Sequence, residues 1–332
     1  MNKGFWKNLN KPVVGLSPMD GVTDAAWRFI AKKYGDPDVI YTEFVSAEGL
    51  WRIKKRNETD SKIWRDLLFD RSEHPVVAQL FGSDPASFYE AAKIIVELGF
   101  DGVDINMGCP SPGLEKRGGG AGLMRKQELA RQVIEETRRG VEDRIPVSVK
   151  TRIGSDLPDE GWWEFLASMD LPAVAMHGRT FKQLYSGLAD WEVLKRASKI
   201  IRNENTLFLA NGDVNVVKVV DGNSTAYLSN EKEISLKDFD GVLIGRAAMG
   251  NPWVFRKDGY KPTIEEKLKV AIDHSKKYEE IFSDSKFFVM RKHLAWYAHG
   301  FSDMKDLRRK LVLTDSARDV EVVVREFLEQ KK

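Results

Sequence analysis

The chain has 332 residues, of which 42% are hydrophobic and 31% charged, and this ordinary composition excludes disordered and fibrous proteins. No apolar run reaches the roughly 18 residues of a membrane-spanning helix, and no apolar leader follows Met1, so we expect a cytoplasmic protein without membrane contact. The 52 basic and 50 acidic residues nearly cancel, so any polyanion must be bound by local basic clusters.

Eight short apolar or β-branched runs predict strands that are buried on both faces, as in a parallel sheet. The predicted strands are Val13–Met19, Val39–Val45, Val76–Gly82, Gly102–Gly108, Pro146–Gly154, Ala173–Arg179, Thr206–Asp213 and Gly241–Ala247. Amphipathic stretches lie between most of them, most clearly at Ala86–Leu98 and Glu128–Gly140. The alternation predicts an α/β fold, a (β/α)8 TIM barrel. An open doubly wound sheet is the alternative, although no G-x-G-x-x-G follows the first strand.

The last part of the chain changes character. Residues Asp221–Asp238 are polar and are interpreted as a surface insertion before the last strand. Beyond Lys261, helical periodicity dominates, at Ile264–Phe282, Lys286–His299, Met304–Leu313 and Ser316–Gln330. We therefore divide the chain into a barrel domain, residues 1–255, and a small helical-bundle domain, residues 256–332.

Polar residues follow the predicted strands at their C-terminal ends, where barrels carry their active sites. The single cysteine, Cys109, lies in the turn Asn106-Met107-Gly108-Cys109-Pro110 after the fourth strand. A lone cysteine excludes an intramolecular disulfide and a structural cysteine–zinc site. At the barrel mouth its thiol is a candidate nucleophile or proton donor, and a small buried apolar residue is the alternative.

Lys150 ends the fifth strand and should face the barrel mouth. Two functions compete for it, a Schiff base with a carbonyl substrate and compensation of the negative charge on a reduced flavin. A structural salt bridge is the third possibility. His177-Gly178-Arg179 ends the sixth strand, where the histidine is either structural or part of the same site.

Two loops predict a phosphate site, because barrels commonly bind phosphate after their last two strands. They are Asn211-Gly212-Asp213 and Gly245-Arg246-Ala247, in which the glycines allow close backbone approach and the arginine adds charge. Simple tight turns are the alternative. The glycine run Gly118–Gly122 lacks the spacing of a P-loop and is interpreted as a mobile loop over the mouth. No H-E-x-x-H motif or paired histidine spacing occurs, so we predict no metal site.

In order and spacing these motifs resemble those of the tRNA-dihydrouridine synthases. The matching segments are Ser17–Asp24, Gln79–Gly82, Asn106–Pro110, Gly118–Met124, Lys150–Arg152, His177–Thr180, Asn211–Asp213, Gly245–Ala247 and Met290–His293 with Tyr297 and Gly300. The resemblance implies an FMN-dependent barrel followed by a helical tRNA-binding domain. The implied reaction reduces uridine in tRNA to 5,6-dihydrouridine with electrons from NADPH. Because the sequence shows no second dinucleotide-binding unit, we expect NADPH to bind at the same opening and to leave before the RNA binds.

The resemblance also implies roles for individual residues. A hydride passes from flavin N5 to uracil C6, Cys109 supplies the proton to C5, and Lys150 contacts the flavin ring. The other implied cofactor contacts are Pro18, Met19, Asp20, Gln79, His177, Asn211, Gly212, Asp213, Gly245 and Arg246. Substrate contacts are assigned to Asn106, Arg152, Arg179, Arg291 and Lys292.

Three alternatives remain at this point. A flavin barrel of the dihydroorotate dehydrogenase type would act on a free pyrimidine-like ring. A Schiff-base aldolase would use Lys150 without a flavin, and a non-catalytic RNA-binding protein would not need Cys109. We expect tRNA as the partner and a monomeric protein.

Overall fold

The computed structural model describes residues 2–58, 60–116, 118–300 and 304–331. Eight parallel strands close into a barrel in the order β1-β11-β7-β6-β5-β4-β3-β2, which confirms the predicted fold class. The barrel strands are β1 (Val13–Leu16), β2 (Ile40–Ser46), β3 (Val76–Phe81), β4 (Gly102–Met107), β5 (Val147–Arg152), β6 (Ala173–His177), β7 (Leu207–Asn211) and β11 (Gly241–Ile244). Each lies within one or two residues of the predicted start.

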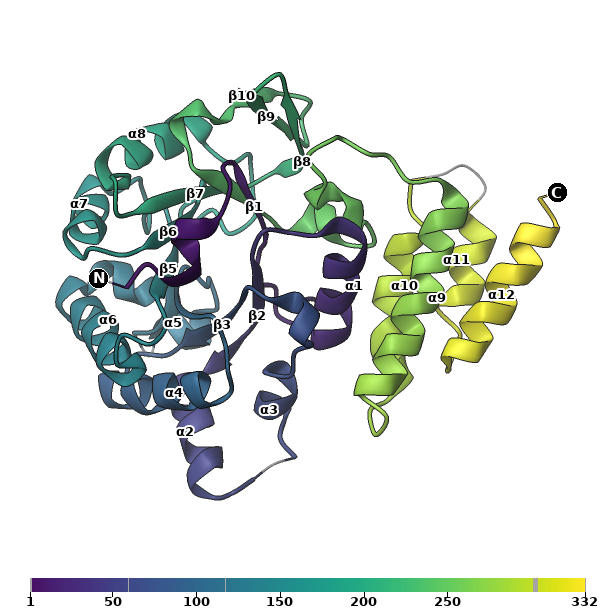
Figure 1. Ribbon diagram of the computed structural model, residues 1–332, viewed down its shortest axis with the longest axis horizontal. Coiled ribbons are helices and arrows are strands. Elements are labelled where there is room, and N and C mark those ends of the chain that lie inside the picture. Colours follow the sequence, from purple (N-terminus) through teal and green to yellow (C-terminus); the bar gives the residue numbers. More distant parts are fainter. Residues whose placement is uncertain (1, 59, 117, 301–303, 332) are drawn as a thin grey trace.

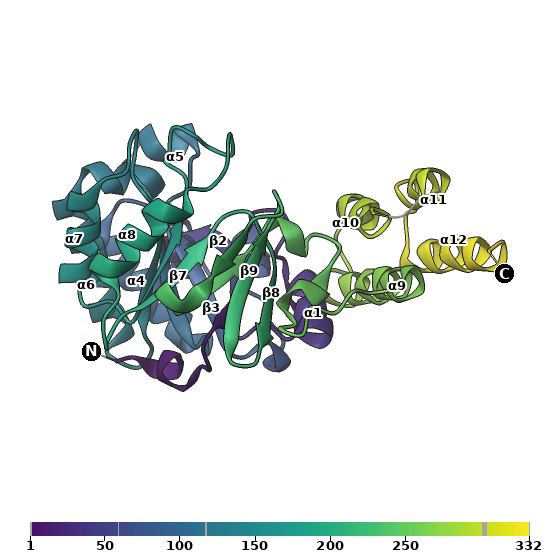
Figure 2. The same cartoon turned by 90° about the horizontal axis from the view of Figure 1, so that it is seen from above.

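Helices surround the barrel, as Figures 1 and 2 show. They are α1 (Ala25–Gly35), α2 (Ala47–Lys55), α3 (Lys62–Asp66), α4 (Pro85–Glu97), α5 (Pro112–Lys116), α6 (Gln127–Val141), α7 (Glu160–Ser168) and α8 (Trp191–Ile201). The N-terminal cap of α4 is formed by the residues that the sequence indicated. Asp84 accepts a hydrogen bond from the backbone of Ser87 and Pro85 occupies the first turn, where its missing N–H costs nothing.

The N-terminal end of the barrel is closed by apolar packing. The short 3-10 helix η1 (Gly4–Asn8) places Trp6 against an interior cluster that includes Val13, Tyr41 and Val77. Closure also depends on Gly241, because a Cβ there would lie 2.1 Å from the carbonyl oxygen of Val13 on the neighbouring strand. Apolar side chains therefore fill the barrel interior at the N-terminal ends of its strands.

One barrel connection contains a sheet in place of a helix. Between β7 and β11 the chain forms β8 (Val214–Val220), β9 (Asn223–Leu228) and β10 (Glu233–Ser235), an antiparallel sheet. Asp221 and Gly222 both have positive φ, as a two-residue hairpin turn requires. The predicted surface insertion is thus an ordered sheet that begins earlier, at Val214, and its edge strand pairs with the linker through Val219 N–H and the Lys257 carbonyl, at 2.9 Å.

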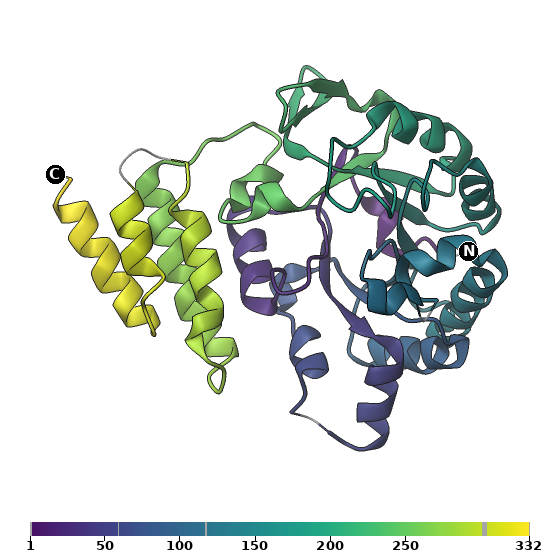
Figure 3. The same cartoon turned by 180° about the vertical axis from the view of Figure 1, so that it is seen from behind.

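The C-terminal helices form a separate layer beside the barrel, visible at one side in Figures 1 and 3. They are α9 (Ile264–Ile281), α10 (Met290–Tyr297), α11 (Lys305–Leu311) and α12 (Ala317–Glu329), close to the four predicted segments. Short 3-10 segments complete the chain: η2 (Arg71–Glu73), η3 (Gly120–Arg125), η4 (Leu236–Asp238), η5 (Arg246–Ala248), η6 (Pro252–Phe255) and η7 (Phe287–Val289). Of the helices in the described ranges, none is long and apolar enough to cross a membrane.

Helix α1 joins the barrel to the helical layer through a buried aromatic cluster. Trp27 lies 5.5 Å from the ring of His274 and 6.1 Å from that of His293, between ring centroids. Burial, together with the neighbouring His274 and Lys292, holds the pKa of His293 well below its usual value. Within the described residues, Nε2 of His293 has no hydrogen-bond partner. This imidazole is consequently a neutral packing group.

Replacing His293 by leucine should weaken the acid sensitivity of folding. The folded imidazole stays neutral whereas the unfolded one binds a proton near its ordinary pKa, so acid favours unfolding. Between about pH 7.5 and pH 5 the wild-type chain should lose roughly 2 kcal/mol more stability than the variant. Urea unfolding at both pH values measures this difference. His299 is exposed, so His299→Leu serves as the control, and an equal pH response of wild type and His293→Leu would contradict the interpretation.

Candidate active site

A cavity of about 640 Å³ opens at the C-terminal ends of the barrel strands. Most of the predicted site residues line it, and they lie in or just after the C-terminal halves of seven barrel strands. They are Pro18, Met19, Asp20, Gln79, Asn106, Cys109, Lys150, Arg152, His177, Asn211, Gly212, Asp213, Gly245 and Arg246. The chain therefore brings residues that are more than 200 positions apart into one site.

The Cys109 turn is held by the side chain of Asn106. Its Oδ1 accepts hydrogen bonds from the backbone N–H groups of Gly108, at 3.1 Å, and Cys109, at 2.8 Å. Arg152 Nε donates to the Gly108 carbonyl at 2.8 Å. The thiol is half-buried, and burial raises its pKa above the ordinary value. A neutral, positioned S–H group at a cavity wall is suited to donate a proton.

The glycine run after this turn is packed and buried, and most of it lies in a short 3-10 helix. Gly120, Ala121 and Gly122 lie in the 3-10 helix η3 and are buried. The backbone N–H of Ala121 donates to the carbonyl of Cys109 at 3.3 Å. Gly120 has a φ of 55°, and a Cβ there would lie 2.8 Å from the Leu114 side chain. Glycine is needed here for close packing behind the Cys109 turn.

Lys150 lies at the end of β5 with little to compensate its charge. Its Nζ is 3.4 Å from Oδ1 of Asn211, whose amide is oriented by donation from Nδ2 to the Leu243 carbonyl at 2.7 Å. Burial, and then the charge of Arg152, lower the pKa of Lys150 to about 8. A desolvated ammonium with one long hydrogen bond favours an electron-rich ligand in the cavity.

One residue of the predicted phosphate site, Asp213, is a buried carboxylate. Asp213 accepts two hydrogen bonds from Arg179 Nη2, both at 2.8 Å, and one from Arg246 Nη2 at 2.7 Å. Its side chain is 4% exposed, whereas that of Arg246 is 55% exposed. A buried carboxylate repels phosphate, so Asp213 acts here by holding Arg246, which faces the cavity. Burial and nearby cations, first Arg152, hold the pKa of His177 well below its usual value.

Arg179 is buried and is not among the cavity-lining residues, so its assignment to the substrate stays a prediction. Its residue is 1% exposed, and its guanidinium donates to Asp213 and to the Gly187 carbonyl at 2.7 Å. It also lies 3.1 Å from Nε2 of His177. These partners stabilise the loop after β6. Sequence position alone could not distinguish this from a ligand contact, because strand ends carry both kinds of residue.

Arg152 lines the cavity, but most of its hydrogen bonds are structural. Nη1 donates to the Thr180 carbonyl at 3.0 Å and to that of Leu184 at 2.9 Å, and Nε reaches Gly108. Burial lowers the Arg152 pKa to about 10. Arg152 therefore ties the Cys109 turn to the loop after β6.

The two predicted RNA contacts in the helical domain lie apart from the cavity lining. Arg291 forms an ion pair with Asp315 at 2.8 Å. Lys292 lies beside the loop after β1, where a Cβ on Gly21 would be 3.4 Å from its Nζ. Of the pair, Lys292 is the one directed toward the mouth of the barrel.

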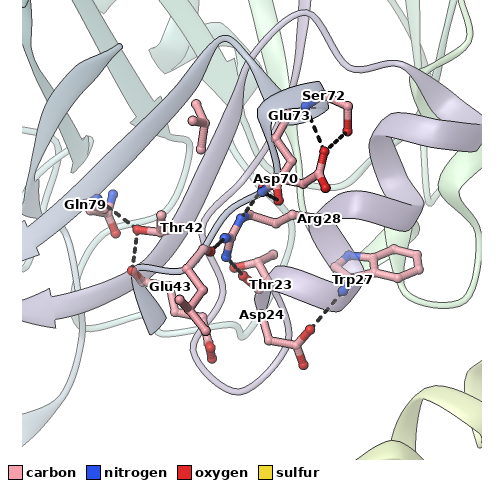
Figure 4. Close-up of polar contacts among 12 residues, drawn as sticks. Thr23, Asp24, Trp27, Arg28, Thr42, Glu43, Asp70, Ser72, Glu73 and Gln79 are labelled. Carbon is pink, nitrogen blue, oxygen red and sulfur yellow. Dashed lines mark hydrogen bonds and ion pairs between the residues drawn. The ribbon is translucent and has the colours of Figure 1, made fainter. Parts of the chain in front are cut away.

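That loop is anchored behind the cavity by a fully buried ion pair. Figure 4 shows Arg28 of α1 directed at Glu73, with Nε and Oε2 2.7 Å apart and both side chains 0% exposed. Arg28 Nη1 also donates to the carbonyl of Thr23, at 2.7 Å, and Glu73 accepts from the backbone of Asp70 at 2.8 Å. The network fixes the segment that carries Met19 and Asp20 along the cavity wall.

Several lining residues were not predicted from the sequence. Tyr185 lies in the loop after β6, with the guanidinium carbons of Arg152 and Arg246 each 5.8 Å from its ring centroid. Asn215 and Ser229 reach the cavity from the inserted sheet. Site residues were predicted from polar residues at the C-terminal ends of predicted strands, and none of these three residues is at such an end. Within the described ranges, no group of three or more His, Cys, Asp or Glu side chains could hold a metal ion.

Comparisons with known proteins agree with the motifs. The family model described as "Dihydrouridine synthase (Dus)" matches residues 15–331. A probable tRNA-dihydrouridine synthase of Staphylococcus aureus (strain Mu50) is 32% identical over 98% of this chain and 96% of that protein. Probable tRNA-dihydrouridine synthase 2 of Bacillus subtilis is 30% identical over 98% and 97%. Among solved structures, a variant of NCR from Zymomonas mobilis has a TM-score of 0.47 and 15% identity, covering 77% of this chain and 91% of that one. The match of the family model across nearly the whole sequence means that the chain belongs to the dihydrouridine synthase family.

Proposed function

We propose that this protein reduces uridine in tRNA to 5,6-dihydrouridine, with bound FMN and with NADPH as the reductant. The family membership and the names of the relatives support this reaction. The observation that carries it is the pairing of a protonated thiol, Cys109, with an under-compensated ammonium, Lys150, on the walls of one cavity.

The residues of the cavity fit a flavin phosphate and an electron-rich ring. Gly212 and Gly245 both line the cavity, and neither has a side chain that would separate its backbone from a ligand. Arg246, held by Asp213, supplies positive charge beside these glycines. When bound and reduced, FMN would supply the hydride that reaches C6 of the uracil.

The residues of this chain then have defined tasks. Lys150 stabilises negative charge at the cavity wall, Asn106 and Gln79 present amide groups to the ligands, and Cys109 delivers its proton to C5. A uracil stacked within tRNA must be turned outward to reach this depth, at a cost of a few kcal/mol that contacts elsewhere must offset. Lys292, beside the mouth, and Arg291 are the proposed contacts of the helical domain with RNA.

Replacing Lys150 by methionine should slow reduction of the flavin by NADPH about a hundredfold, since a positioned charge facing developing negative charge is lost. The pKa of Lys150 is lowered to about 8, so in the wild type the ammonium is present below that pH. The wild-type rate should therefore fall as the pH rises through about 8, and the variant should lack this step. Stopped-flow absorbance measures both rates. Lys199→Met, at an exposed position, is the control, and an unchanged rate in the Lys150 variant would remove the assigned role.

Mapping of dihydrouridine in RNA from cells with and without the protein tests the proposed function. We expect one or more tRNA positions to lose the modification when the protein is absent and to regain it when the wild-type chain is restored. An identical map in both cells would contradict the proposal.

A further inference from the structure

A buried carboxylate beneath the cavity has no place in the reaction described so far. Asp104 lies in β4, is 0% exposed and does not line the cavity. Its Oδ2 accepts a hydrogen bond from Gln79 Nε2 at 2.7 Å, and its Oδ1 accepts one from Ser148 Oγ at 2.6 Å. A charged group in the barrel interior is costly unless it is well hydrogen-bonded, so its presence calls for a physical explanation.

Asp104 begins a chain of hydrogen bonds that ends at the Cys109 turn. Gln79 directs its amide nitrogen at Asp104, so its Oε1 faces Asn106 and accepts from Nδ2 at 3.0 Å. Asn106 in turn directs its Oδ1 at the backbone N–H groups of Gly108 and Cys109. Three side chains on two neighbouring strands, β3 and β4, and the turn after β4 thus form one directed series of hydrogen bonds.

The two ends of this series agree on its direction. A carboxylate can only accept hydrogen bonds, so Gln79 must present its nitrogen to Asp104. Backbone N–H groups can only donate, so Asn106 must present its oxygen to the turn. Both of these oriented residues, Gln79 and Asn106, line the cavity. A neutral amide at position 104 could donate as well as accept, so the Asp104 end would no longer enforce this orientation and only the hydrogen bonds at the turn would favour it.

We propose that Asp104 is a positioning residue, whose carboxylate fixes the amide orientations of Gln79 and Asn106 and thereby holds the Cys109 turn. The inference deepens the proposed function, on which the proton-donor role of Cys109 rests. Asp104 does not touch substrate or cofactor and acts only through these two amides. A secondary effect supports the assignment, because the negative charge of Asp104 favours the charged form of Lys150.

Alkylation of the single cysteine tests the proposal without flavin, NADPH or tRNA. In Asp104→Asn the turn should open more often, and iodoacetamide should alkylate Cys109 roughly fivefold faster, the change expected when a charge-assisted hydrogen bond that holds a local structure becomes a neutral one. Ser148→Ala removes the other hydrogen bond to Asp104 but leaves Gln79 oriented. It should stay within about twofold of the wild-type rate. Mass spectrometry gives the rates, and thermal unfolding shows whether each variant is folded.

A compensating variant separates orientation from simple loss of stability. In the double variant Asp104→Asn with Gln79→Glu, the carboxylate moves one step along the series and again accepts from Asn106. Its alkylation rate should return to within about twofold of the wild type. Should Asp104→Asn fail to fold, a folded double variant with the wild-type rate would still support the proposal. Three results would overturn the proposal. The double variant could be unfolded, the double variant could react as fast as Asp104→Asn, or Asp104→Asn could react no faster than the wild type.

Turnover distinguishes this inference from the proposed function. Asp104→Asn should lower kcat for tRNA about tenfold or more, since small displacements of a catalytic group are costly. The KM for tRNA should stay nearly unchanged because Asp104 lies outside the cavity lining. If the wild-type protein forms no dihydrouridine, the proposed function fails while the alkylation result still stands or falls by itself.

Discussion

Replacing Cys109 by alanine should abolish most formation of dihydrouridine while flavin and tRNA remain bound. Burial raises the pKa of the thiol, so it is protonated at neutral pH and can act as the acid. A well-placed general acid contributes about 10² to 10⁴ in rate, and a loss of this size is expected. The cavity wall is otherwise unchanged, so binding should survive. The measurement is product formed in a single turnover after the flavin has been reduced.

Two controls assign the loss to the proton-transfer step. Reduction of the flavin by NADPH should proceed in Cys109→Ala at the wild-type rate, because the thiol is not needed there. Cys109→Ser keeps a hydroxyl in the same turn but is a weaker acid, and it should retain more activity than the alanine variant. Normal turnover by Cys109→Ala would remove Cys109 from the mechanism.

The second large effect concerns stability, at the buried pair of Arg28 and Glu73. Replacing Arg28 by methionine leaves the Glu73 carboxylate buried without its cation. Loss of one partner of such a pair typically costs about 3–5 kcal/mol. Urea unfolding should show this decrease in the free energy of unfolding. The Arg28→Met substitution should also weaken ligand binding near Met19, because Arg28 donates a hydrogen bond to the Thr23 carbonyl in the same loop.

An exposed ion pair and a double variant serve as controls for the loss of stability in Arg28→Met. Arg196 and Glu160 are 3.0 Å apart with both side chains more than half exposed, and Arg196→Met should cost less than about 1 kcal/mol. Removing both buried charges together, in Arg28→Met with Glu73→Leu, should recover a large part of the lost stability, because no uncompensated charge remains. Equal losses at the buried and the exposed pair would contradict this account of the anchor.

The sequence was sufficient for the barrel because its strands are buried on both faces and read as short apolar runs. The candidate site residues at the strand ends could also be predicted from the sequence, since Cys109 and Lys150 lie at or just after the ends of such runs. Residues 214–235 were harder to interpret, because the polar turns hid a sheet whose inward residues, such as Val217 and Ala226, are buried against the barrel. That misreading also concealed Ser229 at the cavity wall.

Two residues whose partners could not be predicted from the sequence have a feature in common. Arg179 and Asp104 are charged groups whose partners come from other strands, and only the register of the barrel shows whether they face a ligand or each other. Arg179 donates its hydrogen bonds to Asp213 and to loop carbonyls, and Asp104 accepts hydrogen bonds from Gln79 and Ser148. Sequence patterns identify where charge occurs but not which buried group compensates it.

We propose that the cavity binds a flavin and that Cys109 and Lys150 both contribute there to the reduction of a uracil in tRNA. The most direct measurement incubates the purified wild-type chain with FMN, NADPH and tRNA lacking dihydrouridine, and quantifies the modified nucleoside by mass spectrometry. We predict a yellow protein that forms dihydrouridine at defined positions. A colourless protein that takes up no FMN, or a flavoprotein that leaves every uridine unreduced, would contradict the account.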